Sequence, residues 1–125
     1  DPAVLQAAYD DSEGVTAEFN RNILAVVNER LDADFDPRDF DHVARYDREC
    51  RRIEMHLRAR RPVAARIAAI DLDVELRAGE TIRTEVSCKY TRATVEDMLR
   101  AAGLEMDGWF TDDAGRFALS LSRKI

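Results

Sequence analysis

The first residues of the chain repeat their apolar positions with the period of a helix. Asp1 followed by Pro2 is typical of a helix N-cap with proline at the first helical position, so a short helix is predicted over Ala3–Tyr9. The cluster Asp10–Gly14 ends it, and a longer helix is predicted over Val15–Leu31. Its apolar positions recur every three or four residues, which indicates one buried stripe. The expected members of this stripe are Val15, Phe19, Ile23, Val26 and Val27.

The period changes to two from about Val43 to Tyr90, which predicts β-strands. In the first run, Ile53, Met55 and Leu57 share one face, and Glu54, His56 and Arg58 share the other. Two further runs are Val63, Ala65, Ile67 and Ala69, then Leu72, Val74 and Leu76, followed by a turn at Ala78-Gly79-Glu80. We expect an antiparallel meander of four or five strands with one water-exposed face that carries most of the arginines.

The last part of the chain returns to a helical period and then alternates again. A Thr-x-x-Asp pattern at Thr94 and Asp97 predicts the start of a helix that ends at Gly103. A β-hairpin is expected next, with strands over Leu104–Thr111 and Phe117–Ser122 joined by an Asp-Asp-Ala-Gly turn. Its expected apolar anchors are Trp109, Phe117, Leu119 and Leu121. The whole pattern predicts an α+β fold: N-terminal helices, an antiparallel β meander, then a helix and a β-hairpin.

Length and composition describe one modest globular domain. The 125 residues are 46% hydrophobic and 35% charged, and the net charge of −6 argues against nucleic acid as the main partner. No apolar run is long enough to cross a bilayer and no signal-peptide pattern is present, so no membrane partner and a cytoplasmic location are expected. The chain opens with Asp1-Pro2 rather than a methionine, which fits a processed end or a piece of a longer protein.

Several kinds of chemistry are absent from the sequence. Cys50 and Cys88 are expected to be buried thiols in a reducing compartment, and with His42 and His56 they form no set with zinc spacing, so no metal site is expected. Both histidines are expected to be structural or exposed. No arrangement suggests a nucleophile, and the five glycines form no strand-to-helix loop that could bind an adenosyl group. The sequence therefore predicts no catalytic and no cofactor-binding residues in this chain.

The segment Thr81–Tyr90 carries the candidate binding chemistry. If it forms a strand, Glu85 and Ser87 lie on one face, about 7 Å apart at their backbones. A carboxylate only accepts hydrogen bonds, whereas a hydroxyl donates or accepts, so the pair can hold a small ring with one donor and one acceptor, such as an imidazole. The alternative is the polar, solvent-facing side of an ordinary amphipathic strand.

Five separated segments of the sequence can be considered together: D-P-A-V-L-Q-A-A-Y-D-D, G-V-T-A-E-F-N-R-N-I-L, R-I-E-M-H-L, A-G-E-T-I-R-T-E-V-S-C-K-Y and W-F-T-D-D-A-G-R-F-A-L. They resemble, in the same order, the C-terminal part of the histidine-specific Nα-methyltransferases. The similarity covers nearly the whole chain.

The resemblance implies an activity and a division of the chain. Enzymes of this family transfer methyl groups from S-adenosylmethionine to the α-amine of L-histidine, forming hercynine in ergothioneine biosynthesis. Residues 1–89 would be the inserted part of a substrate-recognition domain, and residues 90–125 the helix and hairpin that complete a Rossmann-like methyltransferase sheet. The S-adenosylmethionine site would lie in a missing N-terminal half, so the chain is expected to be inactive alone and to have that half as its partner.

The resemblance also implies a role for four residues. Glu85 and Ser87 would bind the imidazole, Tyr9 would help to hold the substrate carboxylate, and Met55 would line the pocket near the ring. The family's other substrate contacts, an asparagine and tyrosines from the earlier region, have no counterpart in these residues. Met55 could instead be a core residue and Tyr9 a packing residue at a helix end.

Two other functions remain open from the sequence. The chain could be a free-standing, non-enzymatic α+β module that binds an amino acid or dimerises through its terminal hairpin. It could also be part of a relative that methylates a different amine.

Overall fold

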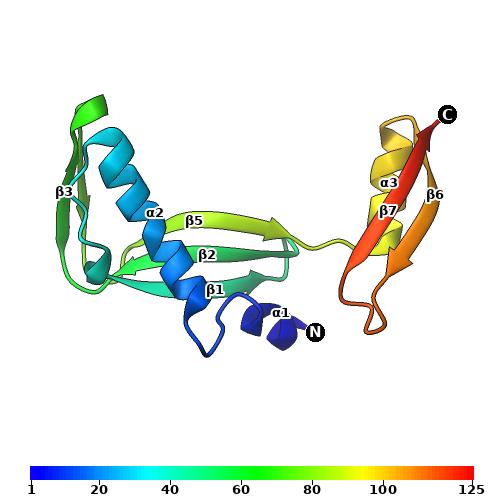
Figure 1. Cartoon of the computed structure of the whole chain (residues 1–125), viewed down its shortest axis with the longest axis horizontal. Helices are drawn as coiled ribbons and strands as arrows, with labels where there is room; N and C mark the ends of the chain where they lie inside the picture. Colours follow the sequence, from blue (N-terminus) through cyan, green and yellow to red (C-terminus); the bar gives the residue numbers. More distant parts are fainter. The chain divides into compact units, whose positions relative to one another are not determined.

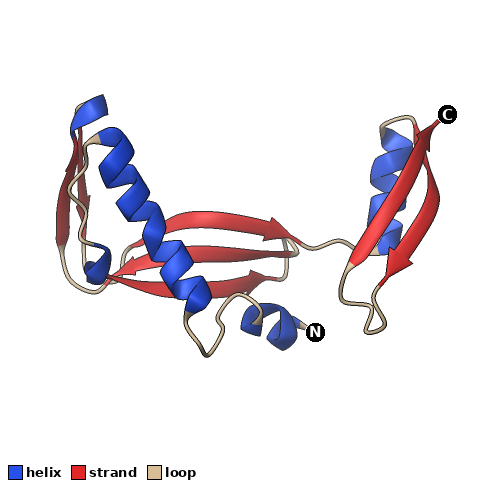
Figure 2. Cartoon of the chain, in the orientation of Figure 1, coloured by secondary structure: helices blue, strands red, loops and turns tan.

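The computed structural model describes residues 1–125 and has the α+β composition that the sequence predicts (Figures 1 and 2). The chain divides into two compact units, Asp1–Cys88 and Lys89–Ile125. Its α-helices are α1 (Pro2–Ala7), α2 (Val15–Leu31) and α3 (Arg92–Ala101), with short 3₁₀ helices at Pro37–Asp39 and Ala68–Ile70. Its strands are β1 (Phe40–Asp47), β2 (Arg52–Ala59), β3 (Val63–Ile67), β4 (Leu72–Leu76), β5 (Thr81–Cys88), β6 (Leu104–Thr111) and β7 (Ala118–Lys124). None of the three α-helices combines the length and the apolar character needed to span a membrane.

The strands of the first unit form two sheets, so the predicted single meander is wrong. Strands β1, β2 and β5 form an antiparallel sheet in that order, and β3 and β4 form a separate hairpin. The hairpin leaves the sheet after Ala59 and the chain returns at Glu80, whose carbonyl oxygen accepts from the Ala59 N–H at 2.8 Å. Alternation shows that each strand has one buried face, but it does not state which strands pair. Ala69, expected to continue β3, lies exposed in the second 3₁₀ helix.

Helix α2 has the predicted bounds but buries a different side. The side toward the sheet carries Asn20 and Leu24, which are 2% and 4% exposed, and the partly buried Val27. Val15 and Phe19, expected in the buried stripe, are 63% and 67% exposed. Ile23 and Val26 are also exposed, so only Val27 of the predicted stripe packs on the core. Apolar residues occupy more than one side of this helix, and the buried side includes a polar residue that a hydrophobic pattern excludes.

The arginines on the outer face of this sheet are water-exposed, as expected: the side chains of Arg45, Arg58 and Arg83 are 63%, 51% and 52% exposed. Two polar residues of β2 on this face are nevertheless buried beneath them. Glu54 and His56 are 2% and 6% exposed. Glu54 accepts from the guanidinium groups of Arg45 on β1 at 2.7 Å and Arg52 on β2 at 2.6 Å. The His56 Nε2 atom lies 3.0 Å from Glu54 Oε2, and Arg83 on β5 completes the cluster at 3.4 Å. A buried carboxylate persists here because it is paired with several cationic groups.

The second unit is a helix packed on a hairpin. Helix α3 begins at Arg92 rather than Thr94: Thr91 is the N-cap, and Thr94 is the N3 residue of a reciprocal capping box. Gly103 follows the helix with φ +72°, and Gly115 at the hairpin turn has φ +63°, both as glycine allows. Strands β6 and β7 pair antiparallel, and Trp109 is half-buried. The hairpin's exposed apolar residues are Phe110, Phe117, Leu119 and Leu121.

Both cysteines are exposed, which corrects the prediction of buried thiols. Cys50 lies in the turn after β1, and Cys88 is the last residue of β5. Turn and strand-end positions have few covering neighbours, so residue type alone is a poor guide to burial there.

Candidate functional site

Met55 and Glu85 lie opposite each other on β2 and β5. Met55 is 3% exposed, whereas Glu85 is exposed, and its carboxylate takes part in no hydrogen bond or ion pair within the chain. Both border a hollow of about 250 Å³ between this strand pair and α2. The other residues around the hollow are Phe19, Asn20, Asn22, Ile23, Val26 and Thr84. An unpaired carboxylate therefore lies beside a mostly apolar depression.

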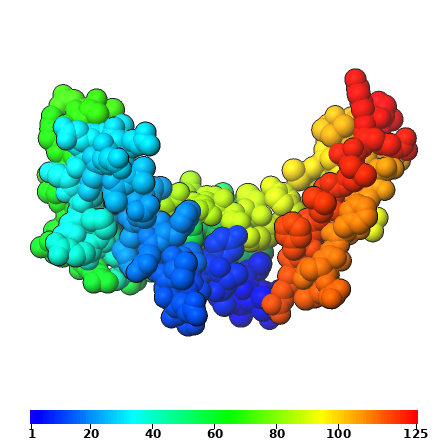
Figure 3. All heavy atoms as spheres, in the orientation of Figure 1, coloured from blue at the N-terminus to red at the C-terminus, as the bar shows by residue number.

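Glu85 and Ser87 share the face of the sheet that α2 covers. Ser87 pairs with Ile53, and Glu85 pairs with Met55, so all four side chains project to the same side. Figure 3 shows the yellow-green atoms of β5 beside the blue atoms of α1 and α2. The structure thus places the acid and the hydroxyl on one face, as the sequence predicts for a strand.

Tyr9 lies two residues beyond the end of α1 and reaches the same face. Its phenolic oxygen is 2.7 Å from Ser87 Oγ. Its backbone carbonyl lies 2.8 Å from His42 Nε2 on β1, which fixes the chain at this point. Of the four predicted site residues, Met55 and Glu85 border the hollow, and Tyr9 and Ser87 form a hydroxyl pair on the same sheet face.

The loop that joins Tyr9 to α2 is fixed by Asp11. Its carboxylate accepts from the backbone N–H groups of Val15 and Thr16 at 2.9 Å and 2.8 Å, in the first turn of α2. Hydrogen bonding to Thr16 is the largest cause that lowers the pKa of Asp11 to about 2, and the Val15 N–H adds to it. A negative charge also suits the positive end of the helix dipole. The loop is therefore restrained at both ends.

Asn20, His42 and Thr84 connect these parts, although the sequence did not indicate them as site residues. Asn20 Nδ2 donates to His42 Nδ1 at 2.9 Å and to the His56 carbonyl at 3.1 Å. Thr84 Oγ1 donates to Asn20 Oδ1 and also lies 3.1 Å from the Met55 carbonyl. A signal was present: Asn20 stands in line with Leu24, Val27 and Leu31 at helical spacing, and a polar residue on a buried side requires a partner.

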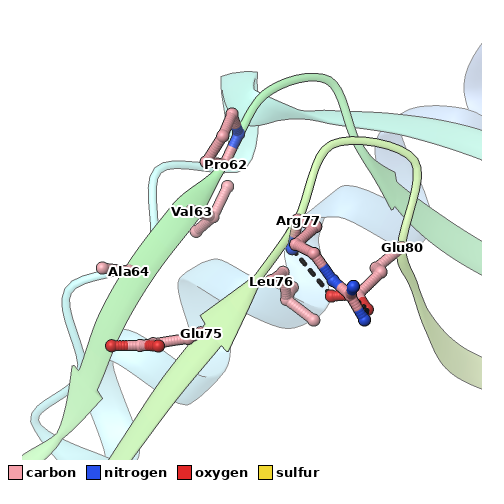
Figure 4. Close-up of a pocket in the computed structure, with 7 residues that line it drawn as sticks. All are labelled: Pro62, Val63, Ala64, Glu75, Leu76, Arg77 and Glu80. Carbon is pink, nitrogen blue, oxygen red and sulfur yellow. Dashed lines mark hydrogen bonds and ion pairs between the residues drawn. The ribbon is translucent and has the colours of Figure 1, made fainter.

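A larger hollow of about 590 Å³ lies at the β3–β4 hairpin (Figure 4). Two of the charged residues beside it are paired with each other: Glu80 accepts from the Arg77 backbone N–H at 2.7 Å and from Arg77 Nε at 3.1 Å. It contains none of the residues singled out by the sequence. This hollow is therefore the weaker candidate for a specific site.

The glycines do not fit a cofactor cradle. Gly14, Gly79 and Gly115 lie in loops and turns, and Gly103 follows α3. Gly108 lies within β6, where an added Cβ would come within 2.8 Å of the Phe110 ring. Every strand pair in the structure is antiparallel. No glycine here lies between a parallel strand and a helix, where an adenosyl group is typically bound.

The arrangement suits recognition of a small polar ring. The carboxylate of Glu85 accepts hydrogen bonds, and the hydroxyl pair of Tyr9 and Ser87 can donate or accept. Met55 and Phe19 offer a polarizable and an aromatic surface at the hollow. The hollow is smaller than the roughly 300 Å³ at which pockets for drug-sized ligands begin, so it suits a single small ring.

Comparison with known proteins matches the chain to one family over almost its full length. Residues 1–124 match the family described as histidine-specific methyltransferase, SAM-dependent. A histidine N-alpha-methyltransferase of Mycolicibacterium smegmatis is 53% identical over 122 residues, which cover 98% of this chain and 38% of that protein. One of Mycobacterium tuberculosis is 53% identical over 124 residues, covering 99% and 39%. The chain therefore spans less than half the length of the curated relatives that it matches.

Proposed function

The chain belongs to the family of SAM-dependent, histidine-specific methyltransferases, and on this basis we propose that it is the substrate-specificity part of such an enzyme. The complete enzyme would transfer methyl groups from S-adenosylmethionine to the α-amine of L-histidine. The cofactor would be held by a portion of the enzyme outside these residues, and the chain would be inactive alone.

One observation carries the proposal: the unpaired Glu85 carboxylate lies opposite Met55 beside a hollow of ring size. In the proposed complex, Glu85 accepts the imidazole N–H and Ser87 bonds the other ring nitrogen. Met55 forms the wall beside the ring, and Tyr9 helps to hold the substrate carboxylate. Together these four residues would hold the ring and the carboxylate of the substrate, so that its α-amine is presented to the methyl donor.

This arrangement would make the enzyme specific without taking part in the transfer. A substrate without the imidazole would leave Glu85 and Ser87 unpaired in a closed site, and buried polar groups without partners cost about 1–3 kcal/mol each. Holding the amine in line with the methyl donor supplies much of the rate in such a reaction. Neither the recognition of the imidazole nor the alignment of the amine requires a catalytic acid or base from this chain.

The proposed partner is the remaining portion of the longer enzyme. Phe19 and Val15 on α2 are more than half exposed, although their neighbours Asn20 and Leu24 are buried. The hairpin of β6 and β7 has an apolar face that is exposed in the same way. Contiguous apolar surfaces of this kind are typical of interfaces. We propose that the remaining portion covers both, and that the hairpin completes its Rossmann-like sheet.

The test is a chimera in which this chain replaces the matching 122 residues of the Mycolicibacterium smegmatis relative. We expect histidine-dependent methyl transfer, measured by mass spectrometry of the product. Glu85→Ala is expected to raise the KM for histidine roughly 10- to 100-fold, because a hydrogen bond to a charged group is lost. The KM for S-adenosylmethionine should stay unchanged. The matched control is Glu75→Ala on β4, an exposed glutamate outside the site. An unchanged KM for histidine in Glu85→Ala would refute the imidazole role.

A second candidate function is a free-standing module that dimerises through the terminal hairpin. The exposed Phe117, Leu119 and Leu121 favour it, because an apolar strand face without cover promotes association. Sedimentation of the isolated chain distinguishes the two functions. A discrete dimer that gains no methyltransferase activity when the remaining portion is added would support the module.

A further inference from the structure

We propose that Asn20 and Thr84 are positioning residues for the histidine site, because they hold the β-bulge that turns Glu85 and Ser87 toward α2. The inference rests on the proposed function and extends it to residues that act through the strand. In this inference, Asn20 and Thr84 do not contact the ring; they determine on which face of the sheet the Glu85 and Ser87 side chains lie.

Strand β5 changes its alternation at Thr84. Ile82 pairs with Leu57 and packs against the core on the α2 side, and Arg83 projects to the other side, near Glu54. In a regular strand, Glu85 would follow Arg83 onto that other side. The pairing instead shifts by one residue between Met55 and His56, so that Thr84 is an additional residue on β5. Thr84 and Glu85, although consecutive, therefore both border the hollow.

The side chain of Thr84 attaches the bulge to its surroundings. Its hydroxyl hydrogen is shared between Asn20 Oδ1 on α2 and the Met55 carbonyl on β2, the latter at 3.1 Å. A bulge disrupts the hydrogen-bond ladder of its strand pair. Here the one hydroxyl hydrogen of Thr84 is directed both at β2 and at the helix, so the bulge is attached to both.

Asn20 can make this bond only in one orientation. Both of its amide hydrogens are used, one by His42 Nδ1 at 2.9 Å and one by the His56 carbonyl at 3.1 Å. A reversed amide would place its oxygen against the His56 carbonyl and leave two acceptors facing each other. The amide oxygen is therefore directed at Thr84. Asn20 is 2% exposed, so water does not compete for these bonds.

The same hydrogen-bond network also extends toward Ser87, the second of the two proposed ring-binding residues on β5. Because His42 Nδ1 accepts from Asn20, its hydrogen lies on Nε2 and is donated to the Tyr9 carbonyl at 2.8 Å. The Tyr9 hydroxyl is in turn bonded to Ser87. Hydrogen bonds thus connect Thr84 to the Tyr9 backbone, and the Tyr9 side chain continues to Ser87. The residues on either side of Glu85 are therefore both held to the N-terminal segment and α2.

The test uses Thr84→Val and Thr84→Ser in the chimeric enzyme described above. Valine keeps the shape and removes the hydroxyl, and serine restores the hydroxyl. We expect Thr84→Val to raise the KM for histidine about 10-fold, and Thr84→Ser to stay within about 2-fold of the parent, as for the loss and recovery of one buried hydrogen bond. The KM for S-adenosylmethionine should not change in either variant. Asn20→Asp keeps an oxygen that can accept from Thr84 but loses both amide donors that direct it, so it should also raise the KM for histidine.

The measured KM values and melting temperatures distinguish a positioning role from a purely structural one, and both from failure of the proposed function. A purely structural role would lower the melting temperature and the amount of active enzyme while leaving the KM for histidine unchanged, which would overturn the proposal. If Glu85→Ala raises that KM but Thr84→Val does not, the positioning role fails and the proposed function stands. If neither variant raises it, the proposed function itself fails. If Asn20→Asp does not fold, the comparison of valine with serine at residue 84 decides.

Discussion

The phenolic oxygen of Tyr9 lies 2.7 Å from Ser87 Oγ, although the two residues are 78 positions apart in the chain. Ser87 is on β5, an edge strand of the three-stranded sheet, and Tyr9 lies just beyond α1. The bond therefore attaches the N-terminal segment to the sheet edge that carries the proposed site.

This bond predicts energetic coupling between the two hydroxyls. Tyr9→Phe and Ser87→Ala should each lower the free energy of unfolding by about 1 kcal/mol, the usual net value of a hydrogen bond. In the double variant the two losses should not add, because both substitutions remove the same bond. Urea unfolding of the four proteins measures this cycle. Strict additivity would mean that the two hydroxyls act independently.

Because Met55 is buried, its substitution should lower the free energy of unfolding by an amount that depends on the size of the new side chain. Its side chain is 3% exposed, so Met55→Ala should cost about 2–5 kcal/mol by leaving a cavity. Met55→Leu keeps the volume and should cost less than about 1.5 kcal/mol. Chemical denaturation gives both values, with exposed Met98 on α3 as the control site for the same substitutions. Equal small costs at the two positions would show that Met55 is not packed in the folded protein.

The cluster around Glu54 predicts a dependence of stability on pH. Hydrogen bonds from Arg45, and next from His56 and Arg52, hold the pKa of Glu54 well below its usual range. A lowered pKa in the folded state means that the stabilisation is complete above the unfolded value, about 4.3, and is lost as the pH falls below it. We expect Glu54→Gln to lower the melting temperature at pH 7.

The same substitution should flatten the loss of melting temperature on acidification below the unfolded pKa of glutamate. Calorimetry at several pH values measures both effects. Other carboxylates with lowered pKa, such as Asp11, remain in the variant, so the difference between the two proteins isolates Glu54. If wild type and Glu54→Gln lose stability in parallel between neutral and acid pH, the cationic neighbours do not stabilise the charged form.

The hairpin of the second unit predicts concentration-dependent association. Phe117 and Leu119 are 69% and 61% exposed, so the isolated chain should associate through this face. Leu119→Ser should shift the chain toward monomer in sedimentation velocity, whereas Ser120→Ala, on the other face of β7, should not. Association that persists in Leu119→Ser would place the contact elsewhere, for example at the exposed side of α2.

Local patterns were sufficient to predict most elements. The bounds of α2 follow from its helical period, and the hairpin turn follows from the Asp-Asp-Ala-Gly sequence before Phe117. Helix α3 was predicted, but its start was placed at Thr94 because two candidate caps lie three residues apart. Thr91 is the cap and Thr94 returns the bond, which the spacing alone does not distinguish. Strand pairing was the less predictable feature, because it depends on contacts between distant segments.

Residue types alone determined that this chain contains a carboxylate and a hydroxyl two positions apart on a strand, together with a family resemblance that comparison confirms. Only the tertiary structure decided where that pair points. Without the bulge at Thr84, regular alternation from Ile82, which faces the core, would have turned Glu85 and Ser87 away from α2. A bulge depends on its partner strand and, here, on a hydrogen bond that Thr84 donates to a helix residue more than sixty positions earlier. Such long-range contacts have no local pattern, so the sequence determined the chemistry and the packing of α2 on the sheet determined its direction.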